Sequence, residues 1–226
     1  KCSKIDIEEG SPAGTMIHFV NEVAKSFPDK TISTLAYQYT RKPPKVKPIE
    51  NVLITLCSIE CDRSVPIERG CKDFSSDLKG WSQLTDNIRI WDYTTQFTNF
   101  LAPFPNWGTL KPNINLFVDN NAKWIFEQHS NNNSELFELR SYIMAKLLWD
   151  PNLDFQFLLN QFNNRYYGSG GEYISEYVNN IQNQIDKTSF FLFLYGDPSQ
   201  AFDSFLSPEN LINYDMLFNK ALSSVE

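Results

Sequence analysis

The sequence predicts an α/β fold in which parallel strand–helix units build a sheet and C-terminal helices follow. Strand-like and helix-like segments alternate four times over residues 1–150, which indicates a parallel sheet with crossover helices. The segment NVLITLCSI at 51–59 is apolar on both faces, as parallel strands covered on both sides are. After Pro151 only amphipathic helical patterns remain. We therefore predict a sheet domain at 1–150 and a helical extension packed on it at 151–226.

The sheet domain begins with a helix and a strand. Residues 10–29 show helical apolar spacing, with Ser11 as the candidate N-cap and Pro12 in the first turn. Residues 31–40, TISTLAYQYT, are rich in β-branched and aromatic side chains and predict the first strand. A basic, proline-rich loop, RKPPKVKPIE, then leads to the second strand at 51–59.

The later elements continue the same alternation. Ser134 is a candidate cap for the strongest predicted helix, whose apolar face would comprise Leu136, Leu139, Ile143 and Leu147. Gly168 is predicted to end a helix. The remaining predicted elements are helices at 74–86, 110–121, 134–150, 152–168, 170–187 and 208–224, and strands at 87–93 and 122–128.

Composition narrows the classes of partner. Of the 226 residues, 42% are apolar, which is enough for a sizeable core, and the formal net charge of -7 argues against a nucleic-acid partner. No run approaches the roughly 20 apolar residues that cross a bilayer, so no membrane span is predicted. The chain opens at KCSKIDIEEG without an initiator Met, as a processed or trimmed piece would. Four strand–helix units cannot close an eight-stranded barrel, so the sheet is either open or the second half of a barrel.

The cysteines leave several pairings open. If residues 57–61 stay extended, about 3.3 Å per residue separates Cys57 from Cys61 by ~13 Å, beyond the ~7 Å limit for a disulfide. A bridge between Cys61 and Cys71 is easier, and unpaired structural cysteines remain the alternative. No His or Cys cluster completes a zinc site, so no metal is predicted.

Polar and aromatic side chains follow every predicted strand. Because ligands bind at the carboxyl ends of parallel strands, these residues are candidates for one site. Aromatic rings stack on the C–H faces of sugars, and carboxylates bind hydroxyl groups or act as acids and bases, so this combination favours carbohydrate. The strand ends carry Tyr37, Gln38 and Tyr39; Cys57, Glu60, Cys61 and Asp62; Trp91, Asp92 and Tyr93; and Glu127, Gln128 and His129.

Each acid has a catalytic and a structural interpretation. Glu60 and Asp62 are candidates for a general base or a hydroxyl acceptor; the alternative is a solvated loop or a salt bridge to an arginine, Arg63 or Arg69. Asp92, between two aromatic residues, is a candidate sugar ligand or a buried structural acid. Glu127 is a candidate partner carboxylate, or a support for the neighbouring strand.

Five aromatic residues are candidate stacking platforms, although aromatic side chains also build ordinary cores. The strongest candidates flank Asp92, and one further residue follows the rigid PFPN loop. The five are Tyr37, Tyr39, Trp91, Tyr93 and Trp107.

Six segments in order carry a resemblance to a known family. They are EGSPAGTMIHFVNEVA, TISTLAYQYTRKPP, NVLITLCSIECD, GWSQLTDNIRIWDYTTQF, PFPNWGTLKPNINLF and LRSYIMAKLLWDPNLD. From residue 1 to about residue 180 the chain resembles an uncharacterised bacterial family that carries only a domain-of-unknown-function label and is regarded as glycoside-hydrolase-like. The resemblance implies a (β/α)₈ barrel related to β-hexosaminidases and α-glucuronidases, of which this chain is the C-terminal half.

The same resemblance implies a periplasmic or secreted protein and a general acid in a barrel half that lies outside this chain. We therefore expect a glycoside hydrolase-like protein that acts on a polysaccharide or oligosaccharide by carboxylate acid/base chemistry, with no cofactor. The alternatives are a non-catalytic carbohydrate-binding protein and an α/β interaction domain whose strand-end acids bind only neighbouring backbone amides.

Overall fold

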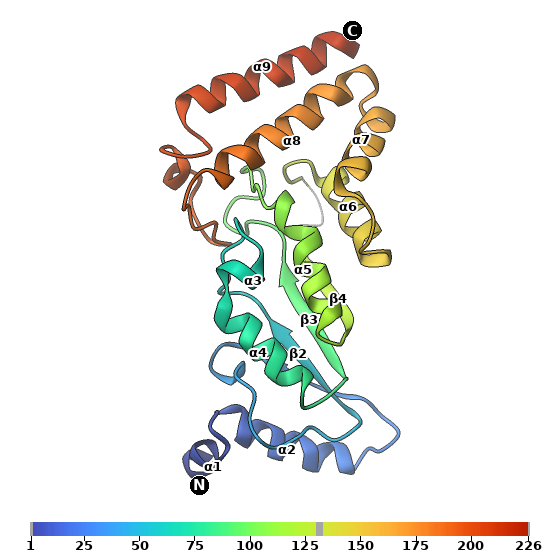
Figure 1. The fold of residues 1–226 in the computed structure, drawn as a ribbon, viewed down its shortest axis with the longest axis vertical. Coiled ribbons are helices and arrows are strands. Elements are labelled where there is room, and N and C mark those ends of the chain that lie inside the picture. The colour runs from blue at the N-terminus through green and yellow to red at the C-terminus, as the bar shows by residue number, and fades with distance from the viewer. Residues whose placement is uncertain (1, 130–132, 226) are drawn as a thin grey trace. The chain divides into compact units, whose positions relative to one another are not determined.

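A computed structural model of the protein describes residues 2–129 and 133–225 (Figure 1). The first elements are α1 (Cys2–Glu9), α2 (Ala13–Lys25), β1 (Ile32–Ala36), the 3₁₀ helix Gln38–Thr40, β2 (Val52–Cys57), α3 (Ile67–Gly70) and α4 (Lys72–Ser82). They are followed by β3 (Ile88–Tyr93), α5 (Trp107–Asp119), β4 (Ala122–Gln128), α6 (Phe137–Trp149) and α7 (Phe155–Tyr166). The last are the 3₁₀ helix Gly168–Gly170, α8 (Gly171–Asp186), the 3₁₀ helix Pro198–Ala201 and α9 (Pro208–Val225).

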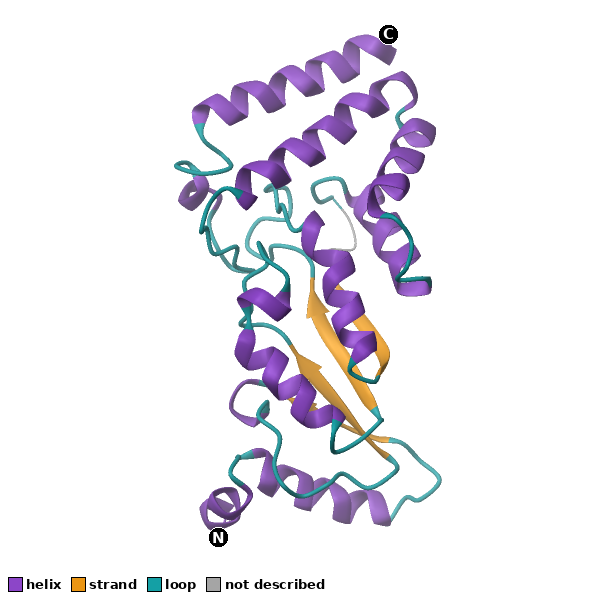
Figure 2. Ribbon diagram, viewed as in Figure 1, coloured by secondary structure: helices purple, strands orange, loops and turns teal. Residues whose placement is uncertain are grey.

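The four strands form one sheet in the order β1-β2-β3-β4, and every pair is parallel (Figure 2). Ile54 of β2 lies opposite Ile88 of β3, and Asp92 of β3 lies opposite Glu127 of β4. The predicted α/β class, with parallel strand–helix units followed by C-terminal helices, is confirmed.

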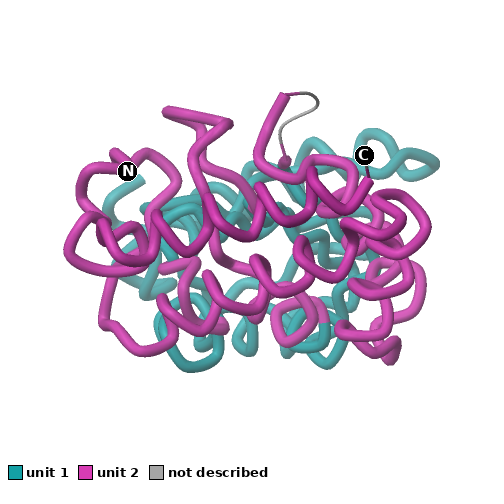
Figure 3. Tube along the Cα trace, turned by 90° about the horizontal axis from the view of Figure 1, so that it is seen from above, with its two compact units in different colours: residues 1–61, 67–93, 115–128 teal, residues 62–66, 94–114, 129–226 magenta. Residues whose placement is uncertain are grey.

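The described chain groups into two compact units, neither of which is continuous in sequence (Figure 3). Unit 1 contains residues 1–61, 67–93 and 115–128, and thus the whole sheet. Unit 2 contains residues 62–66, 94–114 and 129–226, and thus α6 to α9.

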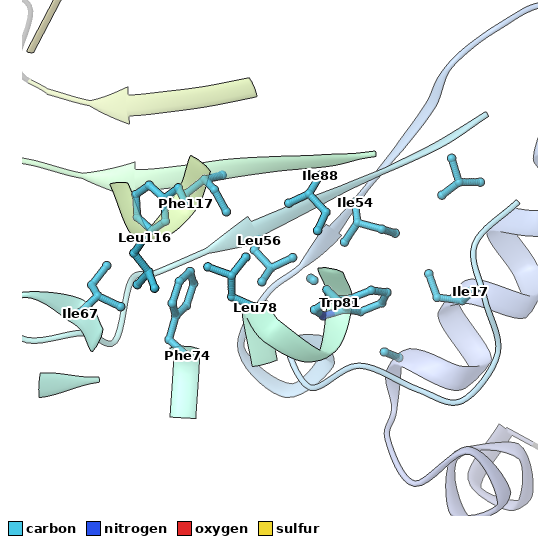
Figure 4. Packing of buried hydrophobic residues seen from close by; sticks show 14 of the residues in the cluster. Ile17, Ile54, Leu56, Ile67, Phe74, Leu78, Trp81, Ile88, Leu116 and Phe117 are labelled. Carbon is cyan, nitrogen blue, oxygen red and sulfur yellow. The ribbon is translucent and has the colours of Figure 1, made fainter. Parts of the chain in front are cut away.

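The core of unit 1 lies between one face of the sheet and its helices (Figure 4). Trp81 of α4 is fully buried, and its indole nitrogen donates a 2.6 Å hydrogen bond to the Arg41 carbonyl. Phe74 of α4 meets Phe117 of α5 edge to face, with ring centroids 6.3 Å apart. The strand residues on this face are Val52, Ile54, Leu56, Ile88 and Ile90, and helix residues facing them include Ile17, Phe74, Leu78 and Trp81.

The helix starts differ from the sequence prediction in two places. α2 begins at Ala13, whose amide donates to the Ser11 hydroxyl at 3.1 Å, so Ser11 binds the first turn from one residue further out. α6 begins at Phe137 because Leu136 has a φ of 47°, a left-handed conformation that cannot extend the helix. The predicted cap role of Ser134 is therefore wrong.

α1 was not predicted, because its sequence has no apolar stripe and none of its residues is buried. A polar contact ties it to the next helix. The Asp6 carboxylate accepts hydrogen bonds from the Thr15 amide at 3.2 Å and the Thr15 hydroxyl at 2.6 Å.

In unit 2, α7 and α8 are joined at a short turn. Asp154 caps α7 by accepting from the Phe157 amide at 2.7 Å. Gly168 follows this helix with a φ of +55°, so its predicted role as a terminator is confirmed.

Candidate functional site

The sheet has two chemically different faces because side chains alternate along each strand. Residues such as Ile54 and Ile88 point to the helix-covered core described above. The alternate residues form the opposite face, where Arg89 Nε donates to the Thr55 hydroxyl at 2.9 Å and Arg89 Nη2 to the Ser33 hydroxyl at 3.2 Å. A polar row thus crosses β1, β2 and β3 on the face that carries no core isoleucine.

Aromatic rings dominate the β3–β4 side of that second face. Trp91 meets Phe126 edge to face at 5.2 Å between centroids, and Trp91 Nε1 donates to Gln128 Oε1 at 2.8 Å. Tyr93 stacks on Trp91 at 6.5 Å, but its ring is buried. Trp124 and Phe126 are 60% and 47% exposed. We call Trp91, Tyr93, Trp124 and Phe126 the aromatic face.

Asp92 lies on the face opposite to Trp91 and Tyr93, since it is the residue between them. It is 2% exposed, and the Ser58 hydroxyl donates to its Oδ1. The strand register places half-buried Glu127 directly beside Asp92. Asp92 and Glu127 therefore lie on the same face of the sheet as direct neighbours on adjacent strands. They are at the carboxyl edge of the sheet, where neighbouring strands lie about 4.8 Å apart.

Glu60 follows β2 in the same unit and forms an ion pair. Its Oε2 lies 3.0 Å from Arg41 Nη1, while Arg41 Nε contacts Asp77 at 2.8 Å. The salt bridge weighed as the alternative for Glu60 is thus present, but its partner is Arg41 rather than Arg63 or Arg69. This arginine precedes Glu60 by 19 residues, so sequence proximity does not reveal the pairing.

Asp62 belongs to unit 2 and binds backbone amides. Its Oδ1 accepts from the Ser64 amide at 2.8 Å and from the Leu192 amide at 3.0 Å. The carboxylate therefore anchors a segment 130 residues further along the chain. In this structure Asp62 has a structural contact that its strand-end position does not predict.

The predicted stacking residues fall into three settings. Trp91 and Tyr93 belong to the aromatic face. Tyr37 and the exposed Tyr39 line an open groove of about 790 Å³ beside β1, together with side chains of α1 and α2 such as Phe19. Trp107, in unit 2, is 1% exposed and lies under the Arg140 guanidinium, whose carbon is 3.9 Å from its ring centroid. Its ring is covered and presents no open face.

The cysteines differ in state. Cys61 and Cys71 form a disulfide, which is the pairing that the spacing favoured. Cys57 is unbridged and buried, and burial, with a contribution from the Glu60 charge, raises the pKa of its thiol to about 11. Cys2 is unbridged and exposed. Among the residues that the structure describes, no group of three His, Cys, Asp or Glu side chains could hold a metal ion.

Sequence reasoning missed a buried charged cluster in unit 2. Arg140 contacts Glu135 at 3.0 Å, donates to the Phe104 carbonyl at 3.0 Å and donates to Asn106 Oδ1. Burial lowers the pKa of Arg140, whereas the Glu135 charge raises it. Burial, together with the Arg140 charge, lowers the pKa of His129 to about 4. The only sequence signal was an arginine within the apolar run of a predicted helix.

Within residues 2–129 and 133–225, no helix is long and apolar enough to cross a membrane.

Comparison with known proteins adds one assignment. A family described as "Domain of unknown function (DUF4838)" matches residues 1–179, which is most of the 226-residue chain. Neither the curated proteins nor the solved structures contain a match. The matched segment includes all four strands, the Asp92–Glu127 pair and the aromatic face. The chain therefore belongs to the DUF4838 family of domains of unknown function.

Proposed function

We propose that this chain is part of a glycoside hydrolase-like protein that acts on a polysaccharide or oligosaccharide by carboxylate acid/base chemistry. The observation that carries the proposal is the register of β3 and β4, which sets Asp92 beside Glu127 at the carboxyl edge of a parallel sheet. Glycoside hydrolysis is carried out by carboxyl groups gathered at one site, and adjacent parallel strands bring Asp92 and Glu127 to the carboxyl edge of the sheet, where they can support the reacting centre.

The proposed roles follow from the contacts of each acid. Glu60 is the candidate general base or hydroxyl acceptor, and its ion pair with Arg41 orients the carboxylate. Asp62 remains a weaker candidate for that role, because two backbone amides already occupy its Oδ1. Asp92 and Glu127 support the reacting centre, and the Ser58 hydroxyl holds Asp92 in position. Trp91 is the candidate stacking platform of the aromatic face, which is the opposite face of the sheet from Asp92 and Glu127. The two groups could therefore meet one ligand only around the carboxyl edge of the sheet.

We further propose that additional parallel strands complete the sheet and supply the proton donor. Ile32 N donates to Asn51 O at 2.8 Å, so Ile32, Thr34 and Ala36 pair with β2, and the backbone groups of Ser33 and Leu35 point to the opposite edge. β4, at the other edge, pairs only with β3 in the described residues. A closed (β/α)₈ barrel needs eight strands, and four more would cover the exposed Trp124 and Phe126.

A periplasmic or secreted location is proposed for the same protein. The Cys61–Cys71 disulfide supports it, because structural disulfides persist in oxidising compartments and are rare in the cytosol.

A non-catalytic carbohydrate-binding protein is the second candidate. The burial of Asp92 to 2% and its bond to Ser58 favour it, because a carboxylate so enclosed braces the strand end rather than meeting a ligand.

The test combines hydrolysis and binding. Asp92→Asn and Glu127→Gln remove the charges while keeping side-chain size, and Asp119→Asn, at an exposed helix end, is the matched control. The measurement is sugar release from neutral and acidic polysaccharides, with the protein in its natural full length. We expect a loss of about a hundredfold or more for the first two variants and none for the control.

The outcomes separate the candidates. Polysaccharide binding that depends on Trp91, without sugar release by the wild type, would replace the hydrolase proposal by the binding protein. Sugar release that persists in both charge-removing variants would contradict the assigned roles.

A further inference from the structure

A segment of unit 2 outside the helices and strands, residues 190–195, carries several aromatic side chains and turns at Leu194–Tyr195, where Gly196 N donates to Phe193 O at 3.3 Å. Leu192 and Leu194 are buried, whereas the alternate residues Phe191 and Tyr195 are each 54% exposed. Hydrogen bonds fix the backbone at both leucines. Arg63 N donates to Leu192 O at 3.0 Å, and Phe97 N donates to Leu194 O at 2.7 Å. The outward direction of the aromatic rings is therefore set by a pinned backbone.

Three exposed rings and two half-buried rings, those of Phe97 and Phe193, form a continuous series of tilted and edge-to-face contacts. Ring centroids lie 6.0 Å apart for Phe191 and Phe193, 5.7 Å for Phe193 and Tyr195, and 5.8 Å for Tyr195 and Phe97. Phe100 extends the series at 6.2 Å from Phe97. We call Phe97, Phe100, Phe191, Phe193 and Tyr195 the aromatic strip. A contiguous apolar patch of this kind on a surface marks an interaction site.

An open groove of about 460 Å³ runs beside the strip, and none of its lining residues is charged. This uncharged lining contrasts with the chain as a whole, which carries 20 basic and 27 acidic residues. Gln200 accepts from the Asp197 amide through Oε1 at 2.9 Å, and its Nε2 group is a hydrogen-bond donor. Tyr195, which also lines the groove, carries a hydroxyl group. The lining residues are Phe190, Phe191, Phe193, Tyr195, Gly196 and Gln200.

We propose that the aromatic strip is a binding platform for a neutral carbohydrate chain. A pyranose ring has an apolar C–H face that covers an aromatic ring and hydroxyl groups that need polar partners at its edge. The strip and its groove supply rings in series, an amide and a phenol. The groove is lined by uncharged residues, and Asp197, which follows Gly196 in the chain, is acidic, which suits a neutral ligand better than an anionic one.

The strip does not include Asp92 or Glu127, which belong to unit 1. Residues 190–200 lie outside the segment 1–179 that matches the family, whereas Phe97 and Phe100 lie within it, and the whole strip belongs to unit 2. Asp62, the weaker candidate for the base, contacts the segment 190–195 through the Leu192 amide. The inference rests on the proposed function only for the class of ligand. It requires no hydrolysis, so binding here holds the polymer and leaves the chemistry to other residues.

Affinity electrophoresis of the full chain tests the platform. Gels contain hydroxyethylcellulose or galactomannan as neutral probes and polygalacturonate as the charged probe. The Phe191→Ala/Tyr195→Ala double variant removes the two most exposed rings of the strip, and Phe157→Ala, which is 57% exposed on α7, is the matched control. Thermal unfolding of each variant verifies its fold.

We expect a neutral probe to retard the wild type and the control. The double variant should bind at least about fivefold more weakly, because the ligand then loses the two most exposed rings of the strip. Tyr195→Phe should retain most of the binding, since it keeps the ring and loses only the hydroxyl.

Three results would overturn the proposal: no retardation of the wild type by either neutral polymer, equal retardation of the double variant, or retardation by polygalacturonate alone. Co-purification of a protein partner that the double variant loses, without polymer binding, would assign the strip to a protein interface instead. Asp92→Asn should retain full retardation, so failure of the hydrolase proposal leaves this result unaffected.

Discussion

Burial decides the chemistry of individual residues more than residue type does. Cys2 and Cys57 are both unbridged, yet one is exposed and the other buried on a sheet strand. The thiolate is the reactive form of cysteine, and burial disfavours it. Of the two, Cys57 therefore has the chemically inert thiol.

Alkylation with iodoacetamide at pH 8 should distinguish the two thiols. A pKa of about 11 leaves so little Cys57 thiolate that we expect its reaction to be at least about a hundredfold slower than that of Cys2. Peptide mass spectrometry after timed quenching measures both rates. Equal rates in the native protein would contradict the burial of Cys57, and denaturation without reductant should equalise them.

His129 is a second residue whose environment sets its charge. Its ring is stacked on Phe137 at 5.4 Å, and its pKa falls to about 4 in the folded protein. The unfolded chain binds a proton near pH 6.5, so it holds more protons than the folded chain between about pH 6.5 and 4. The associated stability is fully present above pH 6.5 and is lost as the pH falls toward 4.

We expect His129→Phe to weaken this acid sensitivity, because a phenyl ring keeps the stacking and has no proton to gain. Chemical denaturation of both proteins at pH 7 and pH 4.5 gives the change in unfolding free energy. The wild type should lose more than the variant. NMR titration of the two histidines provides a direct check, and a His129 midpoint above pH 6 would refute the prediction.

Single elements are held by a few long-range contacts. The Arg140 guanidinium of α6 contacts Glu135 and the Trp107 ring and binds the loop at Phe104 and Asn106. Tyr177 of α8 donates to the other Glu135 oxygen at 2.9 Å. One buried ion pair therefore joins two helices and the start of α5 within unit 2.

Replacing Arg140 by Ala should lower the free energy of unfolding by about 3–5 kcal/mol, because Glu135 would keep a buried charge without its partner. Urea denaturation measures the loss. Adding Glu135→Gln to Arg140→Ala should recover part of it, since the buried charge is then removed. A double variant less stable than the single one would contradict this explanation.

The Cys61–Cys71 disulfide performs a similar role in unit 1, linking the turn after β2 to the N-cap of α4 across 10 residues. A cross-link over a loop of this length lowers the entropy of the unfolded chain, which raises the free energy of unfolding by about 2–3 kcal/mol. The Cys61→Ser/Cys71→Ser variant should lose about that amount in urea denaturation. Unchanged stability would indicate that the bridge does not form in solution.

At the scale of the whole molecule, exposed apolar surface favours self-association and net charge opposes it. Trp124 and Phe126 project from β4, which pairs only with β3 among the described residues and is therefore an edge strand to which another chain could add. The formal charge of -7 at neutral pH opposes such association, but the sequence pI of about 4.9 removes this repulsion under mild acid.

Self-association should therefore increase as the pH falls from 7 to 5. Light scattering at matched protein concentrations measures it. The Trp124→Ser/Phe126→Ser variant should associate less at pH 5, while Phe19→Ser, another exposed aromatic position, should behave like the wild type. Equal association of all three proteins would show that β4 is not the contact.

Periodicity predicted the strands and helices well where the local pattern agreed with the tertiary setting. The predicted strand at 122–128 coincides with β4, and the helix predicted at 170–187 nearly matches α8. The predicted first strand at 31–40 ends early, at Ala36, because Gln38 takes a φ of 48° and begins a 3₁₀ turn. The spacing of apolar residues does not predict a single residue with a left-handed backbone conformation.

The amino-acid sequence alone determined the α/β class, the four parallel strands and the position of Asp92 and Glu127 at strand ends, because the spacing of apolar residues is a local property of the chain. The register that sets these two acids side by side comes from the pairing of β3 with β4 in the tertiary structure. Only the tertiary structure decided which neighbours each acid has. Arg41 binds Glu60, Leu192 binds Asp62 and Ser58 binds Asp92. These contacts join residues 19, 130 and 34 positions apart, and folding rather than sequence spacing brings such residues together.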